Sequence, residues 1–266
     1  MRDLRTALVQ GSTVWHDAAA NREYYGALVR PLKGTVDLVV LPETFTSGFS
    51  NEAVKDAETM QDESVTWLVS LAGEIDAAVV GSIVVRDGEE VFNRLLWATP
   101  QGLDGVYDKR HLFRMAGEHT RYAAGKDRLI VEWREWRICP MVCYDLRFPV
   151  FSRNLHGDDG RMAFDLLLYV ANWPQPRRTA WRVLLRARAV ENLCYVVGVN
   201  RAGQDGNGIE YAGDSAAIDF LGEPLRELDS GAQVGLVDLT AESLTAHRAR
   251  FPAWMDADRF ELIDDS

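Results

Sequence analysis

Three polar residues stand directly after apolar runs of the chain, and their side chains are the groups that acyl transfer requires. Glu43 follows VDLVVLP, Lys109 follows GVYD, and Cys143 follows RICPMV and precedes the turn-like YDLRFP. A thiol is a nucleophile, a carboxylate is a general base, and an ammonium stabilises negative charge on a carbonyl oxygen. Taken singly, the three have ordinary structural explanations, which are capping, surface charge and core packing. Their joint placement favours a catalytic site.

The apolar runs alternate with helix-like segments, which is the βαβ order of an α/β protein. In an open α/β sheet, functional side chains gather at the carboxyl ends of strands, and the three residues above follow strand-like runs. The expected helices cover residues 17–30, 64–75, 177–192 and a C-terminal segment. The expected strands cover residues 4–10, 36–41, 77–85, 91–98, 105–108, 129–133, 137–142, 164–171, 195–200, 216–220 and 233–238.

The composition predicts one folded domain that spans residues 1–266. Hydrophobic residues make up 47% of the chain and charged residues 26%, and no linker rich in Pro, Gly or Ser divides it. The formal net charge of −11 argues against nucleic acid as a partner, because affinity for polyanions is built on Lys and Arg. The chain shows neither a signal-peptide pattern nor an apolar run that would span a bilayer, so we expect a cytoplasmic protein without membrane partners.

The three cysteines fit a reducing compartment better than a disulfide framework. Cys139 and Cys143 lie four residues apart on an expected strand, which separates them by roughly 13 Å at about 3.3 Å per residue. A disulfide needs Cα atoms within about 7 Å of each other. The five histidines are scattered, and no spacing typical of a zinc site occurs. We therefore expect neither a metal nor another cofactor.

Short segments around the three polar residues resemble the signature segments of the nitrilase superfamily of carbon-nitrogen hydrolases, in that family's order. They are LPETFTSGF, YDKRHLF and VCYDLRFP, and further matches are GEHTRYAAG, ANWP, RARAVENLCYVVGVNR, GDSAAIDFLGEP and RFPAWMDADRF. The resemblance implies a four-layer α-β-β-α sandwich that assembles as a homodimer. LPETFTSGF together with KRHLFRMAGEH is most similar to the omega-amidase branch, whose members hydrolyse monoamides of dicarboxylates such as 2-oxoglutaramate.

The resemblance also implies a role for each matched residue. Cys143 would form a thioester with the acyl group, and Glu43 would act as general base and acid. Lys109 and the backbone N–H of Tyr144 would stabilise the tetrahedral oxyanion. Glu118 matches a second glutamate of the family and would orient the substrate amide or Lys109, although its position also suits an ordinary loop carboxylate.

Residues that recognise the substrate are suggested by charge and by the matched segments. Residues 108–128 hold six Lys or Arg against three acidic residues, and such a patch attracts an anionic substrate. Arg147 and Arg114 are candidates for binding a substrate carboxylate, because a guanidinium group matches a carboxylate bidentately. Arg147 has an alternative role in bracing the nucleophile turn. The aromatic candidates for the pocket wall are Phe45, Tyr122 and Trp173. Packing in the core is the alternative role for these three side chains. Along the expected helix 177–192, the series Arg178, Arg182 and Arg186 predicts a solvated face.

Other functions fit the sequence less well. No G-x-S-x-G elbow, P-loop or dinucleotide-binding glycine pattern occurs, and CYDLRF lacks the signature of papain-like enzymes. Another branch of the superfamily remains an alternative, since the same residues can attack a nitrile, an aliphatic amide or an N-carbamoyl group. A catalytically silent scaffold with this fold is the alternative outside the enzymes.

Overall fold

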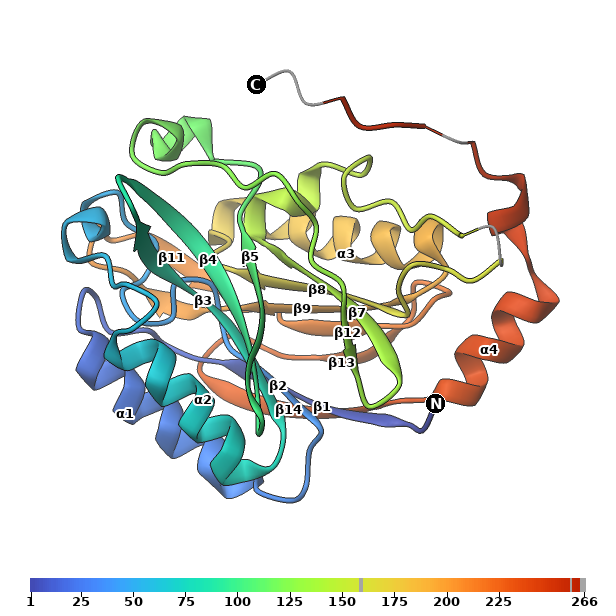
Figure 1. Cartoon of the computed structure of the whole chain (residues 1–266), viewed down its shortest axis with the longest axis horizontal. Coiled ribbons are helices and arrows are strands. Elements are labelled where there is room, and N and C mark those ends of the chain that lie inside the picture. The colour runs from blue at the N-terminus through green and yellow to red at the C-terminus, as the bar shows by residue number, and fades with distance from the viewer. Residues whose placement is uncertain (158–159, 259, 264–266) are drawn as a thin grey trace.

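Two six-stranded mixed β-sheets lie face to face between outer layers of helices in the computed structural model of the protein (Figure 1). The structure describes residues 1–157, 160–258 and 260–263. Arg259, in the RFPAWMDADRF segment, lies outside the described residues. The layers run helix, sheet, sheet, helix, which confirms the expected four-layer α-β-β-α sandwich.

The first sheet has the strand order β14-β1-β2-β3-β4-β5. Strands β1, β2 and β3 are parallel, and the other three extend the sheet by antiparallel pairing. The strands are β1 (Leu4–Gln10), β2 (Leu38–Val40), β3 (Ala78–Asp87), β4 (Glu90–Thr99), β5 (Gly102–Asp108) and β14 (Gln233–Leu239).

The second sheet has the order β13-β12-β9-β8-β7-β6 and follows the same plan. Strands β7, β8 and β9 are parallel in its middle, and antiparallel strands flank them. The strands are β6 (Val131–Trp133), β7 (Trp136–Val142), β8 (Leu166–Ala171), β9 (Tyr195–Asn200), β12 (Ala216–Ile218) and β13 (Pro224–Glu227). A separate hairpin consists of β10 (Ala202–Gln204) and β11 (Glu210–Ala212).

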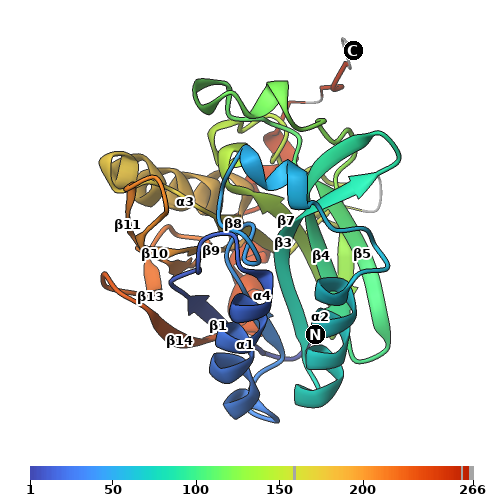
Figure 2. The same ribbon diagram turned by 90° about the vertical axis from the view of Figure 1, so that its left-hand side faces the viewer.

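Helices cover the outer face of each sheet, as Figure 2 shows. Helices α1 (Ala18–Val29) and α2 (Glu63–Ile75) lie on the first sheet, and α3 (Arg178–Asn192) lies on the second. Helix α4 (Ala241–Arg250) follows β14. None of the helices in the described part of the chain is long and apolar enough to cross a membrane. The short 3₁₀ helices are η1 (Arg30–Leu32), η2 (Glu52–Asp56), η3 (Arg114–Ala116), η4 (Glu118–Thr120), η5 (Cys143–Arg147), η6 (Gln175–Arg177) and η7 (Ala253–Asp256).

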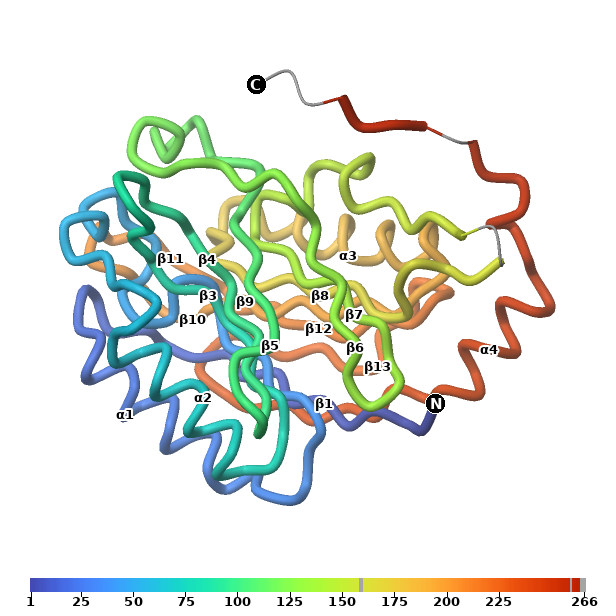
Figure 3. The backbone as a smooth tube through the Cα atoms, viewed as in Figure 1, coloured from blue at the N-terminus to red at the C-terminus, as the bar shows by residue number. Residues whose placement is uncertain are grey.

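Strand β1 shows why the strands of these sheets appear in the sequence as continuous apolar runs. Leu4 and Leu8 pack between the two sheets, whereas Ala7 and Val9 pack beneath the helices of the first sheet. Successive side chains of a strand point to opposite faces, and here both faces are covered. Strand β14 pairs with β1 along its whole length, so that the first and last strands lie side by side (Figure 3).

Candidate active site

The ends of four strands bring the three predicted catalytic residues together with Asn172. Glu43, Cys143 and Asn172 follow the carboxyl ends of the parallel strands β2, β7 and β8, and Lys109 directly follows β5. Because the two sheets are stacked, residues from the end of each sheet meet between them. Glu43 and Lys109 are in direct contact, and Lys109 and Cys143 line the same pocket.

The ammonium group of Lys109 lies between two buried carboxylates. Its Nζ donates to Glu43 Oε1 at 2.9 Å and to Glu118 Oε1 and Oε2 at 2.9 and 3.0 Å. All three side chains are at most 1% exposed. The ring of Phe49 lies 5.1 Å from Nζ on another side. Buried charges persist when they are paired and hydrogen-bonded, so the two carboxylates hold Lys109 in one position.

The carboxylate of Glu43 is oriented by further donors. Its Oε1 accepts from Asn93 Nδ2 at 2.8 Å, and its Oε2 accepts from the backbone N–H of Asn172 at 2.7 Å. The Sγ of Cys143 lies 3.9 Å from the carbonyl oxygen of the same Asn172. Asn172 therefore connects the carboxylate to the thiol through a single residue.

Cys143 occupies a left-handed backbone conformation, with φ of 45°, at the start of η5. Such a conformation costs about 1–3 kcal/mol for a residue other than glycine and persists only where the surroundings enforce it. Asp145, completely buried, does so by accepting from the N–H of Val142 at 3.0 Å and from the hydroxyl of Tyr107 at 2.7 Å. Cys143 and Tyr144 begin η5, so their own N–H groups have no carbonyl partner within that helix.

Burial and neighbouring charges set the protonation states of the site. Burial disfavours the charged form of Lys109, but Glu118 and Glu43 outweigh burial and hold its pKa well above the ordinary value. Burial raises the pKa of Glu118, and Lys109 counteracts part of this rise. Burial also raises the pKa of the Cys143 thiol well above its ordinary value, and the charge of Glu43 adds to the rise, whereas Lys109 opposes it. The resting nucleophile is therefore a neutral thiol whose proton must leave during attack.

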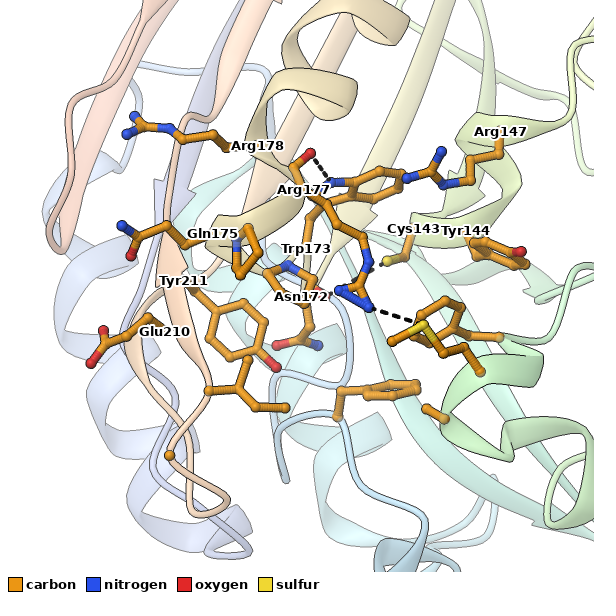
Figure 4. Close-up of a pocket in the computed structure, with 18 of the residues that line it drawn as sticks. Cys143, Tyr144, Arg147, Asn172, Trp173, Gln175, Arg177, Arg178, Glu210 and Tyr211 are labelled. Carbon is orange, nitrogen blue, oxygen red and sulfur yellow. Dashed lines mark hydrogen bonds between the residues drawn. The ribbon is translucent and has the colours of Figure 1, made fainter.

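Lys109 and Cys143 line a pocket of about 840 Å³ (Figure 4). Its wall includes the aromatic residues Phe113, Tyr144 and Trp173. Cationic side chains also line it, among them Arg147. A concave, largely apolar pocket with a few convergent polar groups is typical of a small-molecule site.

Comparisons with known proteins identify the family. The family model described as carbon-nitrogen hydrolase matches residues 5–249. The chain belongs to the carbon-nitrogen hydrolase family. It is therefore an enzyme that hydrolyses carbon-nitrogen bonds, as the resemblance of the short segments predicts.

Relatives of the hydrolase include two named amidases and one solved structure. Omega-amidase YafV of Escherichia coli is 46% identical over 263 residues, which are 98% of this chain and 100% of the relative. A 2-oxoglutaramate amidase of Bacillus subtilis is 34% identical over 207 residues, 76% of each chain. A CN-hydrolase superfamily protein from Xanthomonas campestris, solved with an arsenic adduct in its active site, is 59% identical. It matches with a TM-score of 0.97 over 98% of the hydrolase and 100% of that chain.

Two of the five predicted substrate-binding residues of the hydrolase, Arg147 and Trp173, line the pocket. Phe45 does not line this pocket: it is completely buried under the first sheet's helices and packs against Tyr25 and Trp67, which agrees with the core-packing alternative. Gly81 makes room for its ring, because a Cβ at that position would lie 2.9 Å from Phe45 Cδ1. Phe45 is therefore a core residue.

Tyr122 and Arg114, also predicted to bind the substrate, do not line this pocket either. Tyr122 is buried in a separate apolar cluster, and its hydroxyl donates to the carbonyl of Ser50 at 2.6 Å. Arg114 is exposed at the start of η3. Of the six cationic residues in 108–128, Lys109 is the one that lines this pocket. The arginines that line the pocket come from other segments of the chain and not from the expected basic patch.

The arginines of α3 are ion-paired rather than merely solvated. Arg178 and Arg182 contact the buried carboxylate of Asp214 at 2.8 and 2.6 Å, and Arg186 contacts Glu227 at 2.9 Å. Their side chains are about half exposed, between 41% and 51%. The prediction of a solvated face is therefore partly correct: these side chains are partly exposed, but each also pairs with a specific acidic residue.

Three residues of the site were missed by the sequence-based prediction. Asn93 lies within β4, where nothing in the local sequence separates it from an ordinary strand residue. Asp145 follows Cys143 by two residues and falls within the matched segment VCYDLRFP. Asn172 follows the apolar run of β8 just as Glu43 and Cys143 follow theirs, and applying the same rule there would have found it.

Proposed function

We propose that the hydrolase is an omega-amidase that releases ammonia from the terminal amide of a small dicarboxylate monoamide, of the 2-oxoglutaramate or 2-oxosuccinamate type. The observation that carries the proposal is the meeting of thiol, carboxylate and ammonium beside a pocket that also contains guanidinium groups. The similarity over the full chain to a relative named omega-amidase supports it.

In the acylation half of the proposed reaction, Cys143 Sγ attacks the amide carbon while Glu43 takes the thiol proton. The carbonyl oxygen becomes an oxyanion, which Lys109 Nζ and the backbone N–H of Tyr144 stabilise. When the C–N bond breaks, Glu43 gives its proton to the departing nitrogen, so that ammonia leaves and a thioester remains. A neutral resting thiol suits this sequence, because the proton that Glu43 collects is the one that the leaving group needs.

In the deacylation half, water attacks the thioester carbon and Glu43 accepts a proton from that water. The tetrahedral intermediate then collapses, the C–S bond breaks, and the proton held by Glu43 returns to the sulfur of Cys143. The product is a dicarboxylate. Glu118 takes no covalent part in either half; it holds Lys109 through two hydrogen bonds at the position where the oxyanion forms.

Ammonia release from a panel of compounds tests the proposal. The panel contains 2-oxoglutaramate, 2-oxosuccinamate, uncharged aliphatic amides, nitriles and N-carbamoyl compounds. We expect the highest kcat/KM for the dicarboxylate monoamides. A preference for a nitrile, an N-carbamoyl compound or an uncharged amide would assign the hydrolase to another branch, and no turnover of any member would favour a scaffold.

Arg147 is the first candidate for the substrate carboxylate. Its guanidinium lies 5.0 Å from the Trp173 ring centroid at the pocket wall. We expect Arg147→Ala to lower kcat/KM for 2-oxoglutaramate by about 10- to 100-fold, the range for a lost charge-assisted hydrogen bond. The same variant should hydrolyse an uncharged amide nearly as well as the wild type. Equal losses on both substrates would mean that Arg147 braces the nucleophile turn.

We also propose that the hydrolase works as a homodimer in a reducing compartment such as the cytoplasm. Cys139, Cys143 and Cys194 are buried free thiols, which agrees with such a compartment. Light scattering coupled to gel filtration should give twice the mass of the chain under reducing conditions. A mass equal to that of one chain over a tenfold range of concentration would contradict the dimer.

A further inference from the structure

Four cationic side chains line the pocket, and two of them are committed to carboxylates of the protein. Lys109 is held by Glu43 and Glu118. Arg178 forms a bidentate pair with Asp214, with Nε and Nη2 at 2.9 and 2.8 Å from its two oxygens. The charges of these two cations are therefore largely compensated by neighbouring acids.

The other two cations, Arg147 and Arg177, pair with no carboxylate among the described residues. Arg177 ends η6, just before α3, and its guanidinium lies 5.2 Å from the centroid of the Phe113 ring. Its Nη2 contacts the thioether sulfur of Met115 at 3.6 Å. A thioether is a weak acceptor, so most of the hydrogen-bonding capacity of this guanidinium is available to a ligand.

The position of Arg177 suits a ligand in the pocket. In Figure 4 its side chain projects toward the middle of the labelled residues, whereas that of Arg178 points away from them. The indole N–H of Trp173 donates to the backbone carbonyl of Arg177 at 2.9 Å. This hydrogen bond holds the backbone of Arg177 next to the aromatic ring that the Arg147 guanidinium contacts. Trp173 thus contacts the guanidinium group of Arg147 with its ring and the backbone of Arg177 with its indole N–H.

Charge in the rest of the pocket is consistent with an anionic ligand. Glu210 is the one acidic residue among those that line the pocket; it is exposed, and it accepts from Gln204 Nε2 at 2.9 Å. Aromatic and aliphatic side chains make up much of the wall, and they strengthen an ion pair by excluding water. Two uncompensated guanidinium groups in such a wall favour a carboxylate over an uncharged group.

We propose that Arg177 binds the distal carboxylate of the substrate together with Arg147, and exchanges its Met115 contact for that carboxylate. This inference rests on the proposed function, because a carboxylate at the end opposite the amide is what distinguishes dicarboxylate monoamides from other amides. Arg177 thereby replaces Arg114 as the second carboxylate-binding residue. The two guanidinium groups determine specificity by binding a part of the substrate that does not react.

Paired substrates and a matched control variant test the inference. The substrates are 2-oxoglutaramate and pentanamide, an uncharged amide with the same number of carbon atoms. The variants are Arg177→Gln, Arg177→Lys and the control Arg114→Gln, which removes the same charge from an exposed neighbouring position outside the pocket. We expect Arg177→Gln to lower kcat/KM for 2-oxoglutaramate about 10- to 100-fold, mainly through KM, and to leave pentanamide within about twofold. Arg177→Lys should retain part of the selectivity, because it keeps the charge and loses the planar fork.

Three outcomes would overturn the inference. They are an equal loss on both substrates with Arg177→Gln, no loss on either, and a loss with Arg114→Gln as large as that with Arg177→Gln. Retained pentanamide hydrolysis shows that the variant is folded. A second measurement needs no turnover: in the Cys143→Ala background, 2-oxoglutarate should bind at least about 10-fold more weakly by calorimetry when Arg177→Gln is added. Failure of the proposed function is separate, since it would appear in the wild type as a preference for other compounds.

Discussion

Replacing the nucleophile is expected to abolish hydrolysis while leaving the fold intact. We expect Cys143→Ala to lower kcat on the order of 10⁶-fold, the size of effect that follows the loss of the nucleophile in covalent catalysis. The variant loses a single sulfur atom from a side chain that is 9% exposed, so its stability should change by about 1 kcal/mol. Ammonia release measures the first effect and thermal unfolding the second.

Cys139→Ala is the matched control for this experiment. Cys139 is a buried free thiol in β7, four residues before Cys143, and it does not line the pocket. The Cys139→Ala variant should retain full activity. Intact-mass analysis after incubation with 2-oxoglutaramate should find the acyl adduct only on protein that contains Cys143. Residual turnover by Cys143→Ala above about one hundredth of the wild-type rate would rule out the thioester mechanism.

The positions of Glu43, Lys109 and Cys143 could be predicted from the sequence because each follows a strand. A strand is recognisable as an apolar run, and its carboxyl end places the next residue at a known edge of the sheet. Proline is rare inside strands, yet the expected strand 137–142, which contains Pro140, agrees with β7. Strand β6 pairs with β7 only as far as Ile138, so the missing N–H of proline leaves no partner unsatisfied on that side.

The substrate-binding residues could not be predicted in the same way, because backbone turns decide which side chains reach the pocket. Phe45 is two residues from Glu43, and the intervening Thr44 has a positive φ of 40°, which redirects the chain into the core. A positive φ at threonine is not apparent from its sequence context.

Arg177 and Arg178 illustrate a second limit, which is the effect of distant partners. The two residues are adjacent and chemically identical, yet only Arg178 meets Asp214, which is 36 residues further along the chain. That contact decides which guanidinium is compensated and which is free for a ligand. Local periodicity carries no information about such a partner, so the run of arginines predicted only a charged face.

Lys109 is the residue whose replacement should damage both stability and catalysis. In Lys109→Met, Glu43 and Glu118 remain completely buried and face each other without the cation that binds both. Removing one partner of a buried ion pair typically costs about 3–5 kcal/mol of unfolding free energy. Loss of the positive charge that faces the oxyanion should lower kcat by a further factor of about 10²–10³.

The stability of Lys109→Met should fall more steeply with rising pH than that of wild type. Burial raises the pKa of Glu118 and Lys109 lowers it, so removing the ammonium raises that pKa further. An acid whose pKa is higher in the folded than in the unfolded state stabilises the fold when protonated, and this stabilisation is lost as pH rises through the folded-state value. The variant's melting temperature should therefore fall, relative to wild type, as the pH is raised from below the ordinary carboxyl range toward neutrality.

A double variant separates the structural effect from the catalytic one. Glu118→Gln in the Lys109→Met background removes one of the two opposed buried acids, so it should recover much of the unfolding free energy and flatten the pH dependence. It should not recover kcat, because the positive charge that faces the oxyanion is still missing. Recovery of both quantities together would mean that Lys109 only supports the fold. Lys109→Met with wild-type stability would show that the two carboxylates share a proton already, and the ion-paired description of the site would be wrong.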